Sequence, residues 1–184
     1  MNRPRRPRIA IVSTGGTIEK TYDAMDGVLQ NDVSVLDIML ARLTLSVDVV
    51  RVPLMNKDSL DMSEGDHTLI ARTAAAMAEA HDGVVIVHGT DRLERTGEVA
   101  CDQITDPKCP IVLTGAMRPY ELRSTDALQN LTEALLAAQI LPPGVYCVMH
   151  NRVLTFPNVT KDRDRLTFVD RPGPWSDHEA GDED

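Results

Sequence analysis

Short apolar runs alternate along this chain with longer segments in which apolar residues recur at helical spacing. The apolar runs are rich in Val, Ile and Leu, a composition typical of strands buried in a parallel sheet. They lie at residues 8–13, 47–54, 83–87, 111–113 and 145–149. Helical spacing predicts helices over residues 35–43, 63–80, 92–104 and 124–139. Strands and helices that alternate in this way predict βαβ units.

The predicted fold is a single α/β domain with a doubly wound, mostly parallel sheet and helices on both faces, of the flavodoxin or Rossmann type. We expect this domain over residues 8–169, after a flexible basic N-terminus at residues 1–7. The acidic segment 170–184 has almost nothing to bury and is expected to be disordered. Residues 152–154 either extend the last strand or turn back on it, and the pattern leaves the strand order open.

Local signals refine the boundaries of three helices. Ser63 followed by Asp66 resembles a capping box at the start of an Ala-rich helix. Ser34 is a candidate cap for the first helix, and Ser124 or Thr125 for the last. The polar, aperiodic segment 19–31 predicts a mobile loop that acts as a lid.

Composition and charge exclude several classes of protein. Hydrophobic residues make up 42% of the chain but aromatic residues only 3%, which suits an aliphatic core between a sheet and helices. The formal net charge of −9 argues against a nucleic-acid partner. No apolar run is long enough for a membrane span or a signal-peptide core, so a cytoplasmic protein is expected. Three cysteines without metal-binding spacing are interpreted as buried, reduced thiols.

Polar residues follow four of the predicted strands at the point where each strand ends. These clusters are Thr14–Thr17, Asp58–Ser59, His88–Asp91 and Gly115–Ala116. Ligands of parallel sheets bind outside the carboxyl ends of the strands. The four clusters are therefore expected to converge at one edge of the sheet.

The chemistry of these clusters fits attack on a carbonyl. A hydroxyl beside two glycines, as at Thr17, can approach a substrate closely, although an ordinary turn or an anion cradle fits the same pattern. A hydroxyl nucleophile needs a neighbouring base. Lys161, desolvated beside Asp91, is a candidate base toward Thr90, and the backbone N–H groups near Gly89 or Ala116 are candidate oxyanion donors.

Each of these residues also has a structural interpretation. Lys161 stands in a run of charges that is typical of a solvated surface. Thr90 and Asp91 could cap the following helix. His88 ends a buried strand and is interpreted as a hydrogen-bonded structural histidine, not as a general base. Two further candidates could be plain loop residues, namely Ser59 and Tyr22.

Five short motifs, taken together and in this order, resemble the successive signatures of the bacterial-type L-asparaginase family. They are TGGTI at 14–18, HGTD at 88–91, GAMRP at 115–119, STD at 124–126 with Asn130, and VTK at 159–161. The resemblance implies an amidohydrolase that converts L-asparagine to L-aspartate and ammonia through a threonine acyl-enzyme, without metal or cofactor. It also implies a homo-oligomer, a dimer or a tetramer.

The family's catalytic residues can be carried over to matching positions. Thr17 matches the nucleophile, and Tyr22 is the best match for the loop tyrosine that activates it. Thr90, Asp91 and Lys161 match the second catalytic triad.

The substrate-binding positions that the resemblance implies are Ser59, Leu60, Asp91 and Ala116. Leu60 departs from the family, since many relatives carry a polar residue there. The chain also resembles only the N-terminal domain of relatives about twice as long, as in short-chain members. Two alternatives stay open: an amidohydrolase for glutamine or another amide, and a non-catalytic amino-acid-binding module.

Overall fold

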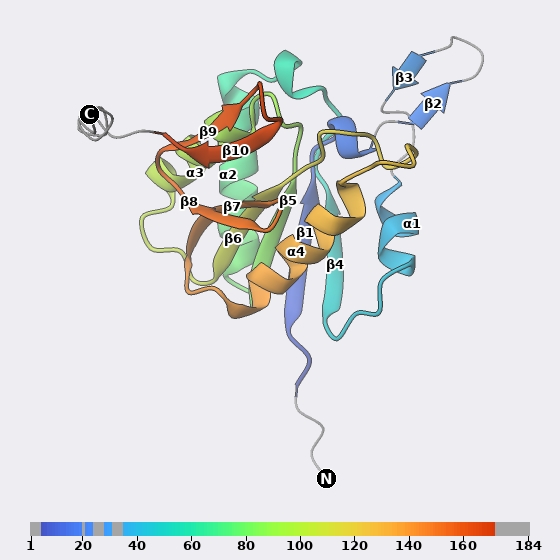
Figure 1. Ribbon diagram of the computed structural model, residues 1–184. Coiled ribbons are helices and arrows are strands. Elements are labelled where there is room, and N and C mark those ends of the chain that lie inside the picture. The colour runs from blue at the N-terminus through green and yellow to red at the C-terminus, as the bar shows by residue number, and fades with distance from the viewer. Residues whose placement is uncertain (1–4, 20, 24–27, 31–34, 172–184) are drawn as a thin grey trace, which may run out of the picture.

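A six-stranded sheet forms the centre of the computed structural model, which describes residues 5–19, 21–23, 28–30 and 35–171 (Figure 1). Its strand order is β4-β1-β5-β6-β7-β8. The strands are β1 (Arg8–Ser13), β4 (Asp48–Pro53), β5 (Gly83–Val87), β6 (Pro110–Thr114), β7 (Gly144–Met149) and β8 (Arg152–Thr155). The first five run parallel and β8 turns back antiparallel to β7. The predicted mostly parallel α/β sheet is confirmed.

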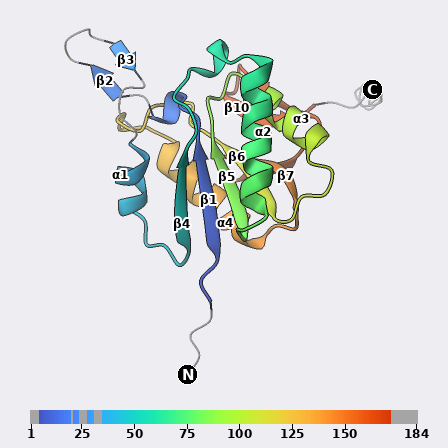
Figure 2. The ribbon, with the colours of Figure 1, turned by 180° about the vertical axis from the view of Figure 1, so that it is seen from behind.

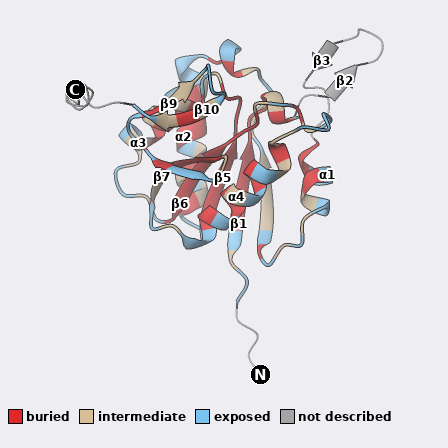
Figure 3. Cartoon of the chain, in the orientation of Figure 1, coloured by how far each residue is buried: buried red, intermediate tan, exposed pale blue. Residues whose placement is uncertain are grey.

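Helices cover both faces of the sheet. One face carries α1 (Leu36–Ala41) and α4 (Ala127–Ile140), and the view from behind shows α2 (Glu64–Ala78) and α3 (Leu93–Gln103) on the other (Figure 2). Strand β1 contributes side chains to the hydrophobic core on both faces of the sheet, because alternate side chains of a strand point to opposite faces. Its Ile9 and Ile11 pack in the core under α1 and α4, whereas Ala10 and Val12 pack under α2 and α3. The central strands are accordingly buried along their length (Figure 3).

The register of the sheet aligns the ends of its central strands. Ser13 at the end of β1 pairs with Val87 of β5, and Val87 pairs with Thr114 of β6. Pro53 of β4 lies opposite Ser13 on the other side. The loops that follow these four strands therefore leave the sheet from one row, as the sequence predicts.

The segment predicted as a mobile lid loop contains two short strands. A 3-10 turn, η1 (Thr17–Glu19), leads into β2 (Thr21–Asp23), which pairs antiparallel with β3 (Val28–Gln30). Residues 20, 24–27 and 31–34 lie outside the described residues, and so does the predicted cap Ser34. The sequence pattern does not predict these two strands, because strands of three residues are too short to show a period in the sequence.

A second ribbon, which the sequence does not predict, closes the domain. It consists of β9 (Val159–Asp162) and β10 (Thr167–Asp170), paired antiparallel. Charged residues in and between the two strands obscure the alternation of apolar and polar residues that is typical of strands. Val159 and Phe168 are nevertheless buried in the core. Strand β10 extends one residue beyond the expected domain boundary.

The cap predictions have mixed outcomes. Ser63 and Asp66 form the predicted capping box of α2. Neither Ser124 nor Thr125 is the N-cap of α4, which is Asp126, but Thr125 Oγ1 accepts a hydrogen bond of 3.0 Å from the N–H of Ala127, the first helical residue.

The basic N-terminal segment and the cysteines also differ in part from expectation. Arg5 of that segment forms an ion pair with Asp82 at 2.9 Å, so its described part is held against the domain. Cys109 and Cys147 are buried free thiols as expected, but Cys101 is only half-buried. Among the helices that the structure describes, none is long and apolar enough to cross a membrane.

Candidate active site

The glycine turn after β1 packs directly against two neighbouring loops. Gly15 and Gly16 have φ angles of 94° and 89°, a region that side chains rarely adopt. A Cβ on Gly15 would lie 2.7 Å from the backbone N of Lys57, and one on Gly16 would lie 2.4 Å from Cα of Gly89. Thr17 begins η1 directly after this turn and is half-buried.

The loop after β4 reaches the same place. A short 3-10 helix, η2 (Ser59–Asp61), is capped by Asp58, whose side chain accepts from the N–H of Leu60 at 3.1 Å. Ser59 is buried, and its Oγ would lie 2.6 Å from a Cβ placed on Gly89. Gly89 is therefore the point at which the loops carrying Thr17, Ser59 and Thr90 meet.

A lysine, a threonine and an aspartate form the polar centre of the site. Lys161 Nζ donates to Thr90 Oγ1 and to Asp91 Oδ1, each at 2.8 Å. The side chain of Lys161 is only 10% exposed, so its interpretation as part of a solvated charge run is wrong. Asp91 keeps 31% exposure and also pairs with Arg163 at 3.4 Å. Strand β9 thus brings Lys161 to residues about 70 positions earlier in the chain.

Helix α3 positions Lys161 through a residue that the sequence analysis did not identify. Glu94 Oε2 accepts hydrogen bonds from the backbone N–H of Lys161 at 2.8 Å and from Thr160 Oγ1 at 3.0 Å. An acidic residue in the first turn of a helix is normally explained by the helix dipole, so it carries no separate signal. Only its partner in β9 distinguishes Glu94 from an ordinary helix-start residue.

His88 lies beneath this centre as a buried, neutral histidine. Its Nδ1 donates to the carbonyl oxygen of Gly89 at 2.8 Å. Burial lowers the pKa of His88 to about 4 despite that hydrogen bond. His88 is fully buried and hydrogen-bonded, which agrees with its interpretation as a structural residue.

The loop after β6 completes the edge of the site. A Cβ on Gly115 would lie 2.3 Å from the carbonyl oxygen of His88 and 3.3 Å from Cγ2 of Thr90, and Ala116 is fully buried. The side-chain amide of Asn130 in α4 donates to the Gly115 carbonyl at 3.0 Å. Together these contacts fix the backbone at Ala116, the position expected to face the substrate amide.

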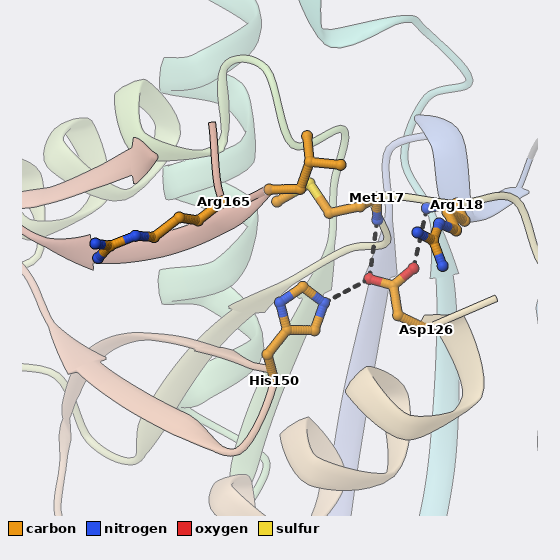
Figure 4. A pocket seen from close by; sticks show the side chains of 6 residues that line it. Met117, Arg118, Asp126, His150 and Arg165 are labelled. Atoms are coloured by element: carbon orange, nitrogen blue, oxygen red, sulfur yellow. Dashed lines mark hydrogen bonds and ion pairs between the residues drawn. The ribbon is translucent and has the colours of Figure 1, made fainter. Parts of the chain in front are cut away.

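Asp126 holds the rest of this loop and lines a pocket of about 240 Å³ beside it (Figure 4). Its carboxylate accepts from the N–H groups of Met117 and Arg118, each at 3.0 Å, and from His150 Nε2 at 2.8 Å. Burial raises the pKa of Asp126, but the hydrogen bonds from Met117, His150 and Arg118 outweigh it, so the net effect lowers the pKa. In Figure 4, Arg165 points away from this group. Asp126 therefore stabilises the loop after β6 by binding two of its backbone N–H groups.

Two other predicted residues are Tyr22 and Leu60. Tyr22 lies in β2 opposite Leu29, and its side chain lies outside the described residues. Leu60 follows Ser59 in η2, but its side chain is 58% exposed. In the part of the chain that the structure describes, no group of three His, Cys, Asp or Glu side chains is arranged to hold a metal ion.

Comparison with known protein families gives a match over most of the chain. The family described as "Asparaginase, N-terminal" matches residues 8–167. The L-asparaginase of Thermococcus kodakarensis is 31% identical over 156 residues, which are 84% of this chain and 47% of that protein. The solved structure of a thermostable L-asparaginase from Thermococcus kodakarensis is 29% identical, superimposes with a TM-score of 0.81 and covers 89% of this chain and 51% of that one.

Further relatives are similar over the same part of the chain. A glutamyl-tRNA(Gln) amidotransferase subunit from Methanococcus vannielii is 30% identical over 154 residues, 82% of this chain and 36% of that protein. The structure of a probable cytoplasmic L-asparaginase from Campylobacter jejuni has a TM-score of 0.76 at 29% identity, and covers 90% of this chain and 53% of that one. The chain spans less than half the length of the curated relatives from Thermococcus kodakarensis and Methanococcus vannielii.

Proposed function

This chain belongs to the asparaginase family, and from that premise we propose that it hydrolyses L-asparagine to L-aspartate and ammonia with Thr17 as nucleophile. Membership of the family supports amidohydrolase chemistry. The substrate and the residue roles are our proposal.

One observation carries the proposal: a lysine ammonium buried to 10% exposure contacts both Thr90 and Asp91 at 2.8 Å. Burying a lysine disfavours its charge unless it is paired, so a purely structural role would be served better by an apolar residue. A lysine placed between a hydroxyl and a carboxylate can instead pass a proton to and from the hydroxyl. The glycine turn of Thr17 packs against the residue that precedes Thr90.

The proposed reaction has two halves. Thr17 Oγ attacks the carbonyl carbon of the side-chain amide and its proton moves to the leaving nitrogen, so the C–N bond breaks, ammonia leaves and an ester forms. Water then attacks the ester, its proton moves to Thr17 Oγ as the bond to that oxygen breaks, and the acid product leaves. Lys161, oriented by Asp91, relays protons through the Thr90 hydroxyl. Backbone N–H groups near Gly89 and Ala116 stabilise the oxyanion.

Substrate binding is proposed at the same edge of the sheet. Ser59 binds the α-carboxylate, Asp91 binds the α-ammonium, and the Ala116 carbonyl lies near the side-chain amide. Leu60 removes one polar contact at this position, and Tyr22 assists Thr17 from the β2–β3 ribbon. No cofactor takes part in the proposed reaction.

A second candidate is hydrolysis of a different amide, such as that of glutamine. A relative that is 30% identical is named as an amidotransferase subunit, which favours keeping this candidate. One methylene changes binding by only about 1–3 kcal/mol, so a pocket of this kind can accept both amides.

The test is ammonia release from the purified protein with L-asparagine, L-glutamine and D-asparagine, compared with the variant Thr17→Ala. We expect turnover of L-asparagine that is lost in Thr17→Ala at unchanged thermal stability. Turnover of L-glutamine alone would support the second candidate. Binding of L-asparagine in calorimetry without turnover would refute the enzymatic proposal and favour a binding module.

Assembly and compartment are part of the proposal. We propose a homo-oligomer, a dimer or tetramer, in the cytoplasm, the compartment given in the name of the Campylobacter jejuni relative. The three free cysteines suit a reducing compartment. Light scattering of the purified protein and fractionation of the source cells test these two points.

A further inference from the structure

A buried chain of three side chains connects α2, α3 and the loop after β5. His67 Nδ1 lies 2.7 Å from Thr96 Oγ1, which lies 2.7 Å from His88 Nε2. The other nitrogen of His88, Nδ1, lies 2.8 Å from the carbonyl oxygen of Gly89. The exposed fraction of all three side chains is 0%. The proposed reaction uses none of these three side chains, although their series of hydrogen bonds ends at Gly89, the residue before Thr90.

The hydrogen bonds of this chain can run in only one direction. A carbonyl oxygen only accepts, so His88 Nδ1 carries a proton. His88 is neutral, because burial lowers its pKa to about 4, and its Nε2 is therefore bare. Thr96 has a single hydroxyl proton and must donate it to that nitrogen. The Thr96 oxygen then accepts from His67, so His67 Nδ1 carries a proton as well.

The surroundings of His67 agree with this order. Burial lowers the pKa of His67, with the opposing charges of Glu64 and Arg95 as the next influences, followed by those of Arg92 and Asp66. A neutral His67 that is protonated at Nδ1 has a bare Nε2. Among the described residues this Nε2 has no hydrogen-bond partner, and a buried bare nitrogen costs less than a buried, unpaired charge.

The hydrogen-bonded series of His67, Thr96 and His88 ends at Gly89, where the loops of the site meet. Gly89 packs against Gly16 and Ser59, and its carbonyl belongs to the same peptide plane as the N–H of Thr90. A rotation of that plane would move Thr90 relative to Lys161, which it contacts at 2.8 Å.

We propose that His67 and Thr96 are positioning residues, which act through His88 and the Gly89 carbonyl to hold Thr90 in reach of Lys161. The role in catalysis rests on the proposed function, but the proton order and its effect on Thr90 do not. His67 and Thr96 lie within helices α2 and α3, not in the loops that carry the reacting groups.

The first measurement is the protonation of the two histidines by long-range proton–nitrogen NMR of the labelled protein. We expect both rings to be neutral near neutral pH and protonated at Nδ1. A proton on Nε2 of either ring, or an imidazolium near neutral pH, would overturn the proposed order.

The second measurement uses Thr96→Val, which keeps the shape but removes the hydroxyl, and Thr96→Ser, which restores it. The matched control is Thr132→Val, because the hydroxyl of Thr132 donates to the carbonyl of Leu128 on an exposed face of α4. For Thr96→Val we expect a shifted Thr90 amide resonance and kcat lowered about tenfold to a hundredfold, with KM nearly unchanged. Thr96→Ser recovers both values, and Thr132→Val changes neither.

The two measurements separate this inference from the proposed function. The wild-type protein could release no ammonia while its Thr90 resonance shifts in Thr96→Val and returns in Thr96→Ser. That result would support the positioning of Thr90 by Thr96 and refute the proposed catalytic function. A Thr90 resonance and a kcat that both stay at the wild-type values in folded Thr96→Val overturn the inference.

Discussion

Replacing Lys161 by Met separates a catalytic lysine from a structural one. Met is close to Lys in length and fills the same space without the ammonium group. The change deletes two contacts of 2.8 Å, to Thr90 Oγ1 and to Asp91 Oδ1. It leaves Asp91 with its second partner, Arg163, at 3.4 Å.

The cost in stability follows from the exposure of the partners. Removing one member of a fully buried ion pair costs about 3–5 kcal/mol, whereas exposed pairs contribute about 0–1 kcal/mol. Asp91 is 31% exposed and keeps Arg163, so we expect a loss of about 1–2 kcal/mol. A domain that starts with at least about 5 kcal/mol stays more than 99% folded after that loss.

The cost in rate is expected to be larger. A group that transfers a proton in the transition state contributes about 10²- to 10⁴-fold to the rate. That range corresponds to about 3–5 kcal/mol of activation free energy. Unfolding therefore cannot account for the expected loss of activity in Lys161→Met.

The assay compares ammonia release and thermal unfolding for Lys161→Met and the control Lys108→Met. Lys108 forms an exposed ion pair with Asp106 and serves as the matched lysine. We expect the control to retain the wild-type rate. A Lys161→Met rate within about twofold of the wild type, on an enzyme that loses activity in Thr17→Ala, would refute the proton-relay role of the lysine.

Two further predictions concern residues that hold the site in place. Glu94→Ala removes the acceptor for the Lys161 N–H, so we expect the free energy of unfolding to fall by about 1.5–3 kcal/mol and turnover to fall as well. Glu94→Gln keeps an amide oxygen as acceptor, so we expect it to recover most of the stability and most of the turnover. Urea unfolding measures the stability of the two variants and ammonia release measures their turnover. Equal stability and equal turnover of Glu94→Ala and Glu94→Gln would contradict the role of Glu94 as an acceptor. The lowered pKa of Asp126 means that its carboxylate stabilises the fold above the unfolded-state pKa of about 3.9 and that this contribution is lost as the pH falls below it. Urea unfolding at several pH values should therefore show that the wild type is more stable than Asp126→Asn near neutral pH and that the gap narrows below about pH 4, and a gap independent of pH would count against this account.

Topology explains which parts of the site the sequence could predict. Parallel strands place their carboxyl ends at one edge, so the loops that begin at Thr14, His88 and Gly115 had to converge once the strands were identified. Lys161 was harder to place, because the charges around it are typical of a solvated surface and its ribbon shows no strand period. The chemistry of a Thr, Asp and Lys group and the order of the motifs, not the local pattern, make Lys161 a candidate site residue.

The contacts made by helix α3 mark the limit of what sequence patterns can show. From one side of its first turns, Glu94 binds the backbone of β9 and so holds Lys161. Two residues later, Thr96 binds His88 below the loop that carries Thr90. The same helix thus controls both members of the Lys161–Thr90 contact. Neither residue has a signal of its own in the sequence, since each acquires its role only when the helix packs between β9 and α2. A rotation of α3 would therefore disturb the candidate site as a unit, although none of the residues that we propose to react lies within the helix.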